Sequence, residues 1–289
     1  MKFAIFICSH GRPECTTVDA LRNAGYRGKI YILLDDEDDR YKEYYRLEDE
    51  RTQVIIFHKQ YFVDNSDIGV SAVKAKRKVI LYAKQACEEF AKFQKLDVFG
   101  IADDDFLGFR YRYPEDGKLK SATVSTGLDA VFENYSQFLV DNNLCMTSVA
   151  TNQMFMGGEL DAERISGFRV PYSFVFRNTA IPFEWKSELF EDVISATLKT
   201  QQGYFMMQMP FMQLNLKPLY AGADGGMTEA YQSVDFIKKL FPVVQYLPSC
   251  TKIATTSNSV SYRLMKDNAF PKVVSSKYKK DCKPKECVI

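Results

Sequence analysis

The stretch Val98-Phe99-Gly100-Ile101-Ala102-Asp103-Asp104-Asp105 is an apolar run that ends in three consecutive carboxylates. A short apolar run of this kind is typical of a buried strand in a parallel sheet. Open α/β sheets bind their ligands at the carboxyl ends of such strands. Because side chains at positions i and i+2 of an extended segment point the same way, Asp103 and Asp105 can converge on one site while Asp104 faces away. Buried carboxylates need a positive partner, and a divalent cation suits them. An acidic turn exposed to water is the alternative.

The composition is that of a soluble globular protein with one large or two modest domains. The chain of 289 residues is 46% hydrophobic and 26% charged, and its formal net charge of +1 does not indicate a partner. The seven cysteines include no C-x-x-C pair, which favours reduced cytosolic thiols over a disulfide framework. No apolar run approaches the length of a membrane span, so we expect a cytoplasmic protein that does not enter a membrane.

Among the strands predicted before the acidic stretch, those at Phe3–Cys8 and Lys29–Leu34 lead directly into polar residues. In a parallel sheet these residues lie at the ligand-binding edge. The ones that could contact a bound anion, a base or a ribose are Ser9, His10, Arg12, Asp35 and Asp36. An ordinary polar loop and a solvated helix start are the alternatives.

A long helix is predicted from Asn65–Gly69 to Phe90, because apolar residues recur there at steps of three and four. Its other face carries Lys76 and Arg77 close to the start, where basic residues oppose the helix dipole. A bound anion would relieve this conflict, although a solvated basic face is equally simple. With a strand at Val54–Phe57, the first half of the chain reads βαβαβαβ, which favours a parallel sheet wound with helices. Neither a P-loop nor a dinucleotide-binding fingerprint is present.

Several other elements are expected along the chain. We expect a helix at Arg40–Arg51, and a second helix after Thr126, whose side chain can cap it. A polar excursion is expected at Tyr111–Lys120, and strands are expected at Leu144–Ala150, Phe174–Arg177 and Tyr204–Leu216. A further helix opens within Trp185–Asp192, with Ser187 as its cap and Glu191 and Asp192 in its first two turns. Acids are favoured at such a position by the helix dipole alone. From Arg263 onward the chain turns basic, with eight Lys and Arg against three Asp and Glu. A solvated tail and a contact with nucleic acid both explain this balance.

Taken in order, these features resemble the GT-A-fold nucleotide-sugar glycosyltransferases over about residues 1–230. The marks are the strand into Ser9–Pro13, the strand ending at Asp35-Asp36, the Gly69…Lys76-Arg77 helix before Asp103-x-Asp105, and Phe190-Glu191-Asp192-Val193. More narrowly, the chain resembles the phage and TET-associated glycosyltransferases that modify hydroxymethylated pyrimidines in DNA. The resemblance implies a Rossmann-like, mostly parallel sheet flanked by helices in a single catalytic domain over residues 1–245, with a nucleotide-binding half (1–110) and an acceptor half (111–245). Residues 246–289 would form a basic C-terminal extension.

The resemblance also implies an activity: metal-dependent transfer of a glucosyl or arabinosyl group from a UDP-sugar to a hydroxyl acceptor, 5-hydroxymethylcytosine in phage DNA, in the host cytoplasm. Mn²⁺ or Mg²⁺ would be held by Asp103 and Asp105, with Asp224 replacing the histidine that many members have after the E-D helix, since no histidine follows His58. Asp104, Lys76 and Arg77 would join the contacts to the nucleotide sugar. Asp192, or failing that Glu191, would be the base that accepts the proton of the acceptor hydroxyl.

Two other classes of function are compatible with the sequence. One is a related enzyme, either a GT-A glycosyltransferase that acts on a polysaccharide or protein, or a nucleotidyltransferase. The other is a non-catalytic nucleic-acid-binding protein that uses the basic C-terminal region. The residues leave open which sugar is transferred, whether the anomeric configuration is inverted, and the oligomeric state.

Overall fold

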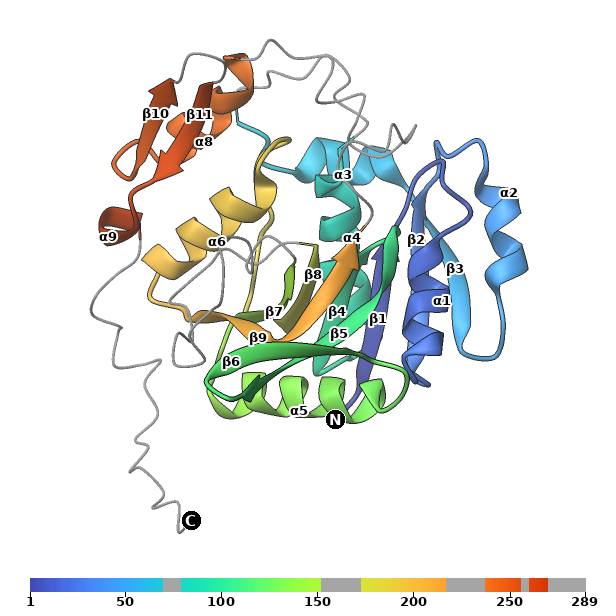
Figure 1. Cartoon of the computed structure of the whole chain (residues 1–289). Coiled ribbons are helices and arrows are strands. Elements are labelled where there is room, and N and C mark those ends of the chain that lie inside the picture. Colours follow the sequence, from blue (N-terminus) through green and yellow to red (C-terminus); the bar gives the residue numbers. More distant parts are fainter. Residues whose placement is uncertain (70–78, 152–172, 217–236, 256–259, 270–289) are drawn as a thin grey trace.

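A large mixed sheet runs through the molecule, and helices cover both of its faces (Figure 1). The computed structural model describes residues 1–69, 79–151, 173–216, 237–255 and 260–269. Within them the strands are β1 (Phe3–Cys8), β2 (Lys29–Asp35), β3 (Thr52–Phe57), β4 (Val98–Asp103), β5 (Phe106–Glu115), β6 (Lys118–Thr123), β7 (Met146–Thr151), β8 (Phe174–Asn178), β9 (Met206–Leu216), β10 (Thr251–Thr255) and β11 (Val260–Leu264). The helices are α1 (Thr16–Asn23), α2 (Tyr41–Tyr44), the 3-10 helix η1 (Tyr45–Leu47), α3 (Lys59–Asn65), α4 (Leu81–Phe93), α5 (Leu128–Asp141), α6 (Glu191–Gln201), the 3-10 helix η3 (Lys238–Leu240), α8 (Phe241–Tyr246) and α9 (Lys266–Ala269).

The first four strands form a parallel half-sheet in the order β3-β2-β1-β4. The predicted parallel α/β core is therefore confirmed. Strand β1 lies between β2 and β4, so the chain winds outward from β1 first in one direction and then in the other. This is a topological switch point, where the loops that leave the carboxyl ends of the two neighbouring strands diverge and open a ligand-binding crevice. Because Cys8 pairs with Asp103 in register, the residues after β1 lie beside the acidic stretch.

The second half of the sheet is mixed. Strand β8 is antiparallel to β4 and β7, β7 is parallel to β9, and β9 is antiparallel to β5, which completes the order β8-β7-β9-β5-β6. The predicted polar excursion at Tyr111–Lys120 is wrong in kind, because β5 and β6 form an antiparallel hairpin there. Its alternating half-exposed and exposed residues hid the strand pattern, since neither face of the projecting hairpin is fully buried.

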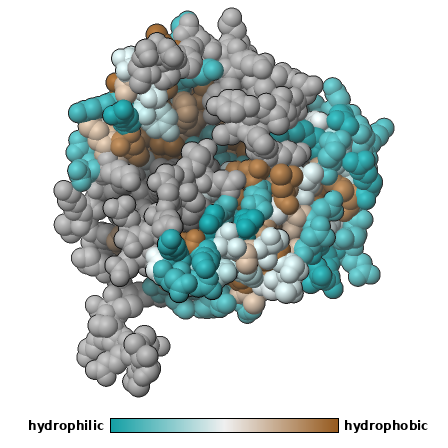
Figure 2. Space-filling view, in the orientation of Figure 1, coloured by the Kyte–Doolittle hydropathy of each residue, from teal (hydrophilic) through white to brown (hydrophobic). Residues whose placement is uncertain are grey.

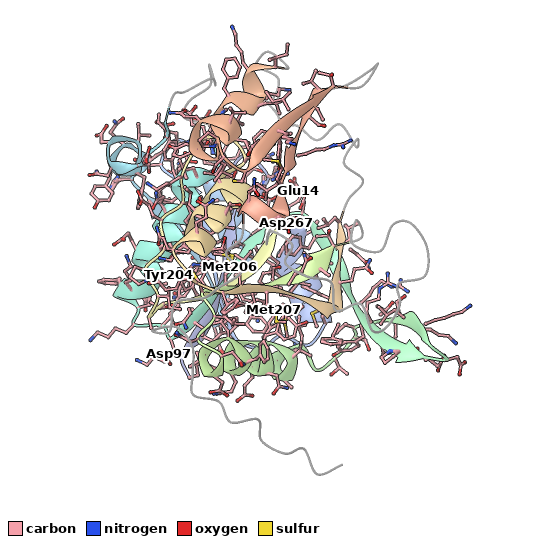
Figure 3. All side chains as sticks on the ribbon, turned by 90° about the vertical axis from the view of Figure 1, so that its left-hand side faces the viewer. Glu14, Asp97, Tyr204, Met206, Met207 and Asp267 are labelled. Atoms are coloured by element: carbon pink, nitrogen blue, oxygen red, sulfur yellow. The ribbon has the colours of Figure 1, made fainter. Side chains whose placement is uncertain are left out.

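Alternation along the strands divides the core into two layers. Ile5 and Ile7 of β1 face one side and pack in a cluster with residues of α1 and α5. Phe6 and Cys8 face the other side and pack in a cluster with residues of α4 and α6. The period of two in a strand produces this division, and it explains why the parallel strands read as continuous apolar runs. Met206 and Met207 of β9 show the same alternation, one buried and the next 36% exposed (Figure 3).

A third, smaller cluster joins the C-terminal elements to α6. Strands β10 and β11 form a separate antiparallel hairpin. Val193 and Ile194 of α6 pack with Val243 of α8, and Tyr262 and Leu264 of β11 pack against the same cluster (Figure 1). The described part of residues 246–289 is thus folded onto the domain, and residues 270–289 lie outside the described residues. No helix in the described ranges is both long and apolar enough to cross a membrane.

The predicted helix at Arg40–Arg51 is wrong in length. A short helix, Tyr41–Tyr44, and one 3-10 turn, Tyr45–Leu47, take its place. Glu48 is extended, and the chain must turn within a few residues because β3 begins at Thr52. Of the predicted helix at 65–90, the described part begins at Leu81, and α3, at Lys59–Asn65, was not expected.

Both predicted side-chain caps are also wrong. Helix α6 begins at Glu191, after Phe190 in the left-handed region (φ 57°), and the Ser187 hydroxyl instead donates to the Leu189 carbonyl at 2.8 Å. Helix α5 follows Gly127 (φ 83°), without a side-chain cap from Thr126. At both positions a left-handed residue, rather than a hydroxyl, turns the chain into the helix. This places Glu191 and Asp192 as the first two residues of α6.

Candidate active site

The loop after β1 is held by the α2 segment. The Gly11 amide donates to Asp38 Oδ2 at 2.8 Å, and the Arg12 amide donates to the hydroxyl of buried Tyr44 at 2.8 Å. Ser9 Oγ lies 2.8 Å from the same Tyr44 hydroxyl. These contacts from Asp38 and Tyr44 fix the shape of the β1–α1 loop, which carries the predicted residues Ser9, His10 and Arg12.

Asp104 is bound on the loop side of the acidic stretch. The Arg12 guanidinium forms an ion pair with Asp104, with Nη2 2.6 Å from Oδ1, and its Nε donates to Oδ2 at 3.1 Å. Ser9 Oγ also donates to Asp104 Oδ2. Burial raises the pKa of Asp104 to about 6, while the charge of Arg12 and the Ser9 hydrogen bond oppose the rise. The Asp104 carboxylate is therefore occupied by protein groups, and it orders Ser9 and Arg12.

Asp35, at the end of β2, is bound by a histidine and a lysine. His10 Nδ1 lies 2.9 Å from Asp35 Oδ2, and Lys59 Nζ lies 3.2 Å from Oδ1. Burial acts to raise the pKa of Asp35, but His10 and Lys59 together outweigh it and lower the pKa. The hydrogen bond to Asp35 is the main cause that raises the pKa of His10. Asp36 is more exposed and accepts the Lys59 amide at 3.1 Å.

Lys59 is a site residue that the sequence analysis missed. It lies at the start of the unexpected helix α3, and it is only 3% exposed although lysine is seldom buried. Its ammonium group also lies 3.5 Å from Glu37 Oε2. In the sequence, Lys59 is a single lysine after a strand, and nothing in the residues around it distinguishes it from a lysine exposed to water.

The backbone of the acidic stretch is pinned to α1 by Thr17. Its Oγ1 donates to the Asp103 carbonyl at 2.7 Å and accepts the Phe106 amide at 2.9 Å. The Asp103 amide donates to the Ser173 carbonyl at 3.2 Å. With its backbone tied on both sides, the segment from Asp103 to Phe106 holds its carboxylates in fixed directions.

A buried lysine links the acidic stretch to α6. Lys84 of α4 lies with Nζ 2.6 Å from Glu191 Oε1, and the same ammonium group lies 4.7 Å from the centroid of the Trp185 ring. Burial acts to lower the pKa of Lys84, but the charges of Glu191, Asp192 and Asp103 outweigh it and raise the pKa. Lys84 therefore stays charged and brings carboxylates from β4 and α6 to one place.

Trp185 extends this contact to a second buried ion pair. Its Nε1 donates to Glu88 Oε1 at 3.2 Å, and Arg177 Nε lies 2.8 Å from the same oxygen. Lys84 and Glu88 are one turn apart on the same face of α4, so both reach the layer between that helix and the sheet. The sequence analysis missed this network, although charged residues on the Leu81–Ala91 stripe of α4 were a signal that could have revealed it.

Asp192 forms no such ion pair with any residue that the structure describes. Its Oδ1 accepts the amide of Val193 at 2.8 Å. Burial and the neighbouring charge of Glu191 raise the pKa of Asp192 to about 6, although Lys84 opposes the rise. A carboxylate with this pKa is ionised at neutral pH but accepts a proton readily, which suits a general base. Glu191, in contrast, is held by Lys84.

The charges of this region fit a divalent cation. Lys84 and Arg12 face five carboxyl groups, those of Asp103, Asp104, Asp105, Glu191 and Asp192, so the described residues leave an excess of negative charge. Among the described residues no group of three His, Cys, Asp or Glu side chains is placed to hold a metal ion. Asp103 and Asp105 can still fit Mg²⁺ or Mn²⁺, because such ions often take one or two carboxylates and complete their shell with substrate phosphates and water. Burial raises the pKa of Asp103 to about 7.

The predicted site residues Lys76, Arg77 and Asp224 lie outside the described residues.

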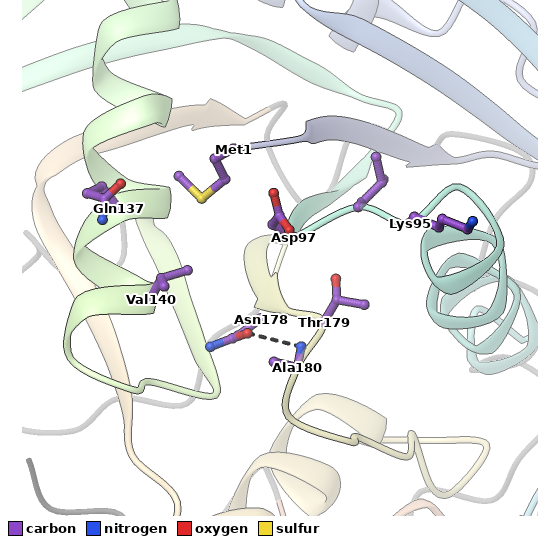
Figure 4. A pocket seen from close by; sticks show the side chains of 9 residues that line it. Met1, Lys95, Asp97, Gln137, Val140, Asn178, Thr179 and Ala180 are labelled. Carbon is purple, nitrogen blue, oxygen red and sulfur yellow. Dashed lines mark hydrogen bonds between the residues drawn. The ribbon is translucent and has the colours of Figure 1, made fainter.

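A surface cavity of about 580 Å³ lies at the other end of the sheet (Figure 4). Its lining includes Asp97, which precedes β4, and Asn178, which ends β8. Their polar groups already have partners, since Asp97 Oδ2 accepts the Lys2 amide at 2.7 Å and Asn178 Oδ1 accepts the Ala180 amide at 3.1 Å. Asp97 lies near the lower end of the molecule, away from α6 and from the β10–β11 hairpin (Figure 3). The cavity is therefore separate from the acidic site, at the amino ends of the parallel strands.

Comparisons with known proteins give one family and several solved structures. The chain is similar to glucosyl-3-phosphoglycerate synthase from Mycobacterium tuberculosis with Mn²⁺, UDP and phosphoglyceric acid, at 9% identity over 91% of this chain and 86% of that chain, with a TM-score of 0.43. The complex with Mn²⁺, UDP-glucose and phosphoglyceric acid gives 7% identity over 91% and 86%, with a TM-score of 0.44. A cytidylyltransferase from Leptospira borgpetersenii gives 10% identity over 86% of this chain and 96% of that chain, with a TM-score of 0.39. No curated protein sequence matches the chain. Residues 3–216 match the family described as TET-Associated Glycosyltransferase.

Proposed function

Because this chain belongs to the TET-associated glycosyltransferase family, we propose that it transfers a sugar from a UDP-sugar to 5-hydroxymethylcytosine in DNA. Membership makes the chain a glycosyltransferase that uses a nucleotide sugar, and it decides against a nucleotidyltransferase and against a non-catalytic binding protein. The observation that carries the mechanism is the meeting of Asp103 with Glu191 and Asp192 around Lys84, at the carboxyl edge of the parallel strands. If the chain is phage-encoded, the reaction takes place in the cytoplasm of the host.

The donor half of the site is formed by the loops after β1 and β2. His10 and Asp35 lie at the switch point, where the base and ribose of a nucleotide would bind. Arg12, held by Asp104, projects beside Asp105, with Nη1 3.9 Å from Asp105 Oδ2. It can therefore offer a fixed positive charge to a phosphate. Asp103 and Asp105 would hold the Mn²⁺ or Mg²⁺, which when bound would neutralise charge on the departing diphosphate.

The acceptor half of the site is the start of α6. The carboxylate of Asp192 takes the proton from the acceptor hydroxyl while the oxygen of that hydroxyl forms a bond to C1 of the sugar. The bond between C1 and the diphosphate oxygen breaks, and UDP leaves with the bonding electrons. Lys84 holds Glu191 and so keeps Asp192 as the carboxylate available to the acceptor. This assignment describes inversion at C1; an enzyme that retains configuration would not need a base in this place.

DNA is proposed as the acceptor on the basis of the family and the basic C-terminal sequence. Lys and Arg side chains can track successive phosphates and bind more weakly as salt increases. A base inside a duplex cannot reach a carboxylate at a sheet edge while it is stacked. We therefore expect the hydroxymethylated base to be flipped out of the helix during transfer.

A panel of UDP-sugars, tested on duplexes that carry either cytosine or 5-hydroxymethylcytosine, examines this proposal. We expect a mass gain of one sugar on the hydroxymethylated nucleoside alone, after digestion and mass spectrometry. Transfer should stop in EDTA and resume with Mn²⁺ or Mg²⁺. Modification of a polysaccharide or protein, without any modified nucleoside, would replace DNA as the acceptor.

Asp105→Asn tests the metal site, with Asp116→Asn as the matched control. Both substitutions remove one carboxylate charge at constant shape, but Asp116 lies in the exposed turn between β5 and β6. We expect Asp105→Asn to lose transfer without any fall in the urea midpoint, because removing one of several clustered charges relieves repulsion. Asp116→Asn should behave like the parent protein. Full activity of Asp105→Asn would remove the metal from this position.

A further inference from the structure

The hairpin β10–β11 lies outside residues 3–216 that match the family, yet it reaches the start of α6. The ring of Tyr262 in β11 meets the ring of Phe190 edge to face, with centroids 5.0 Å apart and planes at 70°. Phe190 immediately precedes Glu191 and Asp192 and turns the chain into α6. The hairpin thus forms a wall beside the two carboxylates from which the acceptor half of the site is built.

Tyr262 packs beside the helix start that carries these carboxylates, close enough for their charges to act on its phenol. Burial raises its pKa, and the negative charges of Asp192 and Glu191 raise it further. Within the residues that the structure describes, the Tyr262 hydroxyl has no hydrogen-bond partner, and the side chain is only partly buried. A phenol with a free hydroxyl beside the catalytic base can donate to, or accept from, a polar group on a bound molecule.

The rest of the hairpin presents further groups suited to a nucleic acid. Ile253 pairs with Tyr262 across the strands and is 46% exposed. Paired residues share one face of a hairpin, so an apolar surface continues outward from Tyr262. Apolar side chains are visible over this region in the space-filling view (Figure 2).

Two cations occupy the other face. Lys252 and Arg263 are directly opposite one another and both are exposed. Like charges in this arrangement destabilise a hairpin unless an anion lies between them. Among the described residues no carboxylate pairs with either of them. A phosphate group of a polynucleotide would supply the missing charge.

We propose that β10 and β11 form the acceptor subsite, in which Tyr262 contacts the flipped nucleotide beside Asp192 while Lys252 and Arg263 bind phosphates of the flanking strand. This inference rests on the proposed DNA acceptor and names the surface that holds it. Proteins that bind an unstacked nucleotide commonly combine an aromatic side chain for the base with cations for its backbone. The β10–β11 hairpin supplies both, with the ring on one face and the cations on the other.

Tyr262→Phe isolates the hydroxyl, because the ring that packs on Phe190 remains. We expect the KM for hydroxymethylated DNA to rise about tenfold, the loss expected for one hydrogen bond. The KM for the UDP-sugar, the slow hydrolysis of the donor without acceptor, and the urea midpoint should stay unchanged. Tyr113→Phe, on the half-exposed β5 hairpin, is the matched control and should leave all four values unchanged. A shifted urea midpoint with an unchanged KM for DNA would make Tyr262 a packing residue only and overturn the proposal.

The double variant Lys252→Gln/Arg263→Gln tests the phosphate contacts. Binding of hydroxymethylated duplex, measured at several salt concentrations, should weaken, and the slope of log Kd against log salt should fall by about two. Lys42→Gln/Lys92→Gln removes two exposed charges elsewhere on the surface and should leave the slope unchanged. Equal slopes for the two double variants would contradict the phosphate contacts. If the parent protein modifies no DNA at all, the proposed function fails; if it modifies DNA and the hairpin variants behave normally, only this inference fails.

Discussion

Breaking the ion pair between Lys84 and Glu191 should destabilise the protein far more than its single contact suggests. Both side chains are buried, with Nζ 2.6 Å from Oε1. Lys84→Met keeps most of the aliphatic stem that packs beside Trp185, but it leaves Glu191 without its cation next to Asp192 and Asp103. An uncompensated buried charge of this kind costs about 3–5 kcal/mol. At roughly 2 °C per kcal/mol for a chain of this size, the melting temperature should fall by at least about 6 °C.

Lys84→Met/Glu191→Met removes both charges and should recover most of this loss. Replacing a buried ion pair by apolar side chains of similar volume is often neutral or stabilising, because both desolvation penalties disappear together. The double variant should therefore unfold near the parent protein, although its turnover will be low. A double variant that is as unstable as Lys84→Met would show that the cost comes from lost packing, and it would refute the electrostatic reasoning.

Lys92→Met is the matched control on the same helix. Lys92 Nζ lies 2.8 Å from Glu89 Oε1, but the two side chains are 52% and 58% exposed. An exposed pair of this geometry contributes at most about 1 kcal/mol, because water screens both charges. Urea unfolding can be followed by the fluorescence of Trp185, the single tryptophan of the chain, whose ring lies against Lys84. Equal midpoints for Lys84→Met and Lys92→Met would contradict the reasoning.

Three further predictions concern the base, the backbone and the C-terminal sequence. Asp192→Asn should retain UDP binding in calorimetry and lose turnover. In the parent protein, kcat should decrease at pH values below about 6. The raised pKa of Asp192 means that its carboxylate is protonated there and cannot accept the proton of the acceptor. A flat profile between pH 5 and 8 would exclude Asp192 as the base. Gly69→Ala should cost about 1–3 kcal/mol in urea unfolding, because Gly69 has φ 63° and a Cβ would lie 2.8 Å from the Tyr246 hydroxyl; an unchanged midpoint would contradict the strain. Truncation after Pro271 should lower both the affinity for hydroxymethylated duplex and its salt dependence, and unchanged values would remove these residues from DNA binding.

Local sequence pattern was sufficient for the parallel half of the sheet. Strands β1, β2 and β4 are continuous apolar runs because both faces of each are covered, and such runs are legible without a structure. Their carboxyl ends carry polar residues, and the carboxyl ends of parallel strands share one edge. The grouping of Ser9, Asp35 and Asp103 at that edge followed from this geometry alone.

The order of the remaining strands depended on contacts between distant segments. Strand β8 enters between β4 and β7, and β5 pairs with β9 at the far side of the sheet. Pairings of this kind are decided by which faces find apolar partners, and the sequence of one segment does not contain that information. The left-handed turns at Phe190 and Gly127 were missed for a related reason, since packing selected the helix start in place of a hydroxyl cap.

The identity of the buried charged residues was decided by tertiary structure alone. Lys84 and Lys59 look like solvated lysines in the sequence, because burial depends on what packs over a helix face rather than on the helix itself. Lys84 is buried because Trp185 and Glu191 come from a segment about 100 residues away and supply a ring and a carboxylate to meet its charge. Tyr262 lies at the start of α6 because the β10–β11 hairpin packs there, and no pattern in the sequence of the hairpin indicates this contact. Local periodicity thus identified which carboxylates face the ligand edge, while the cations and the aromatic ring beside them were positioned by long-range packing.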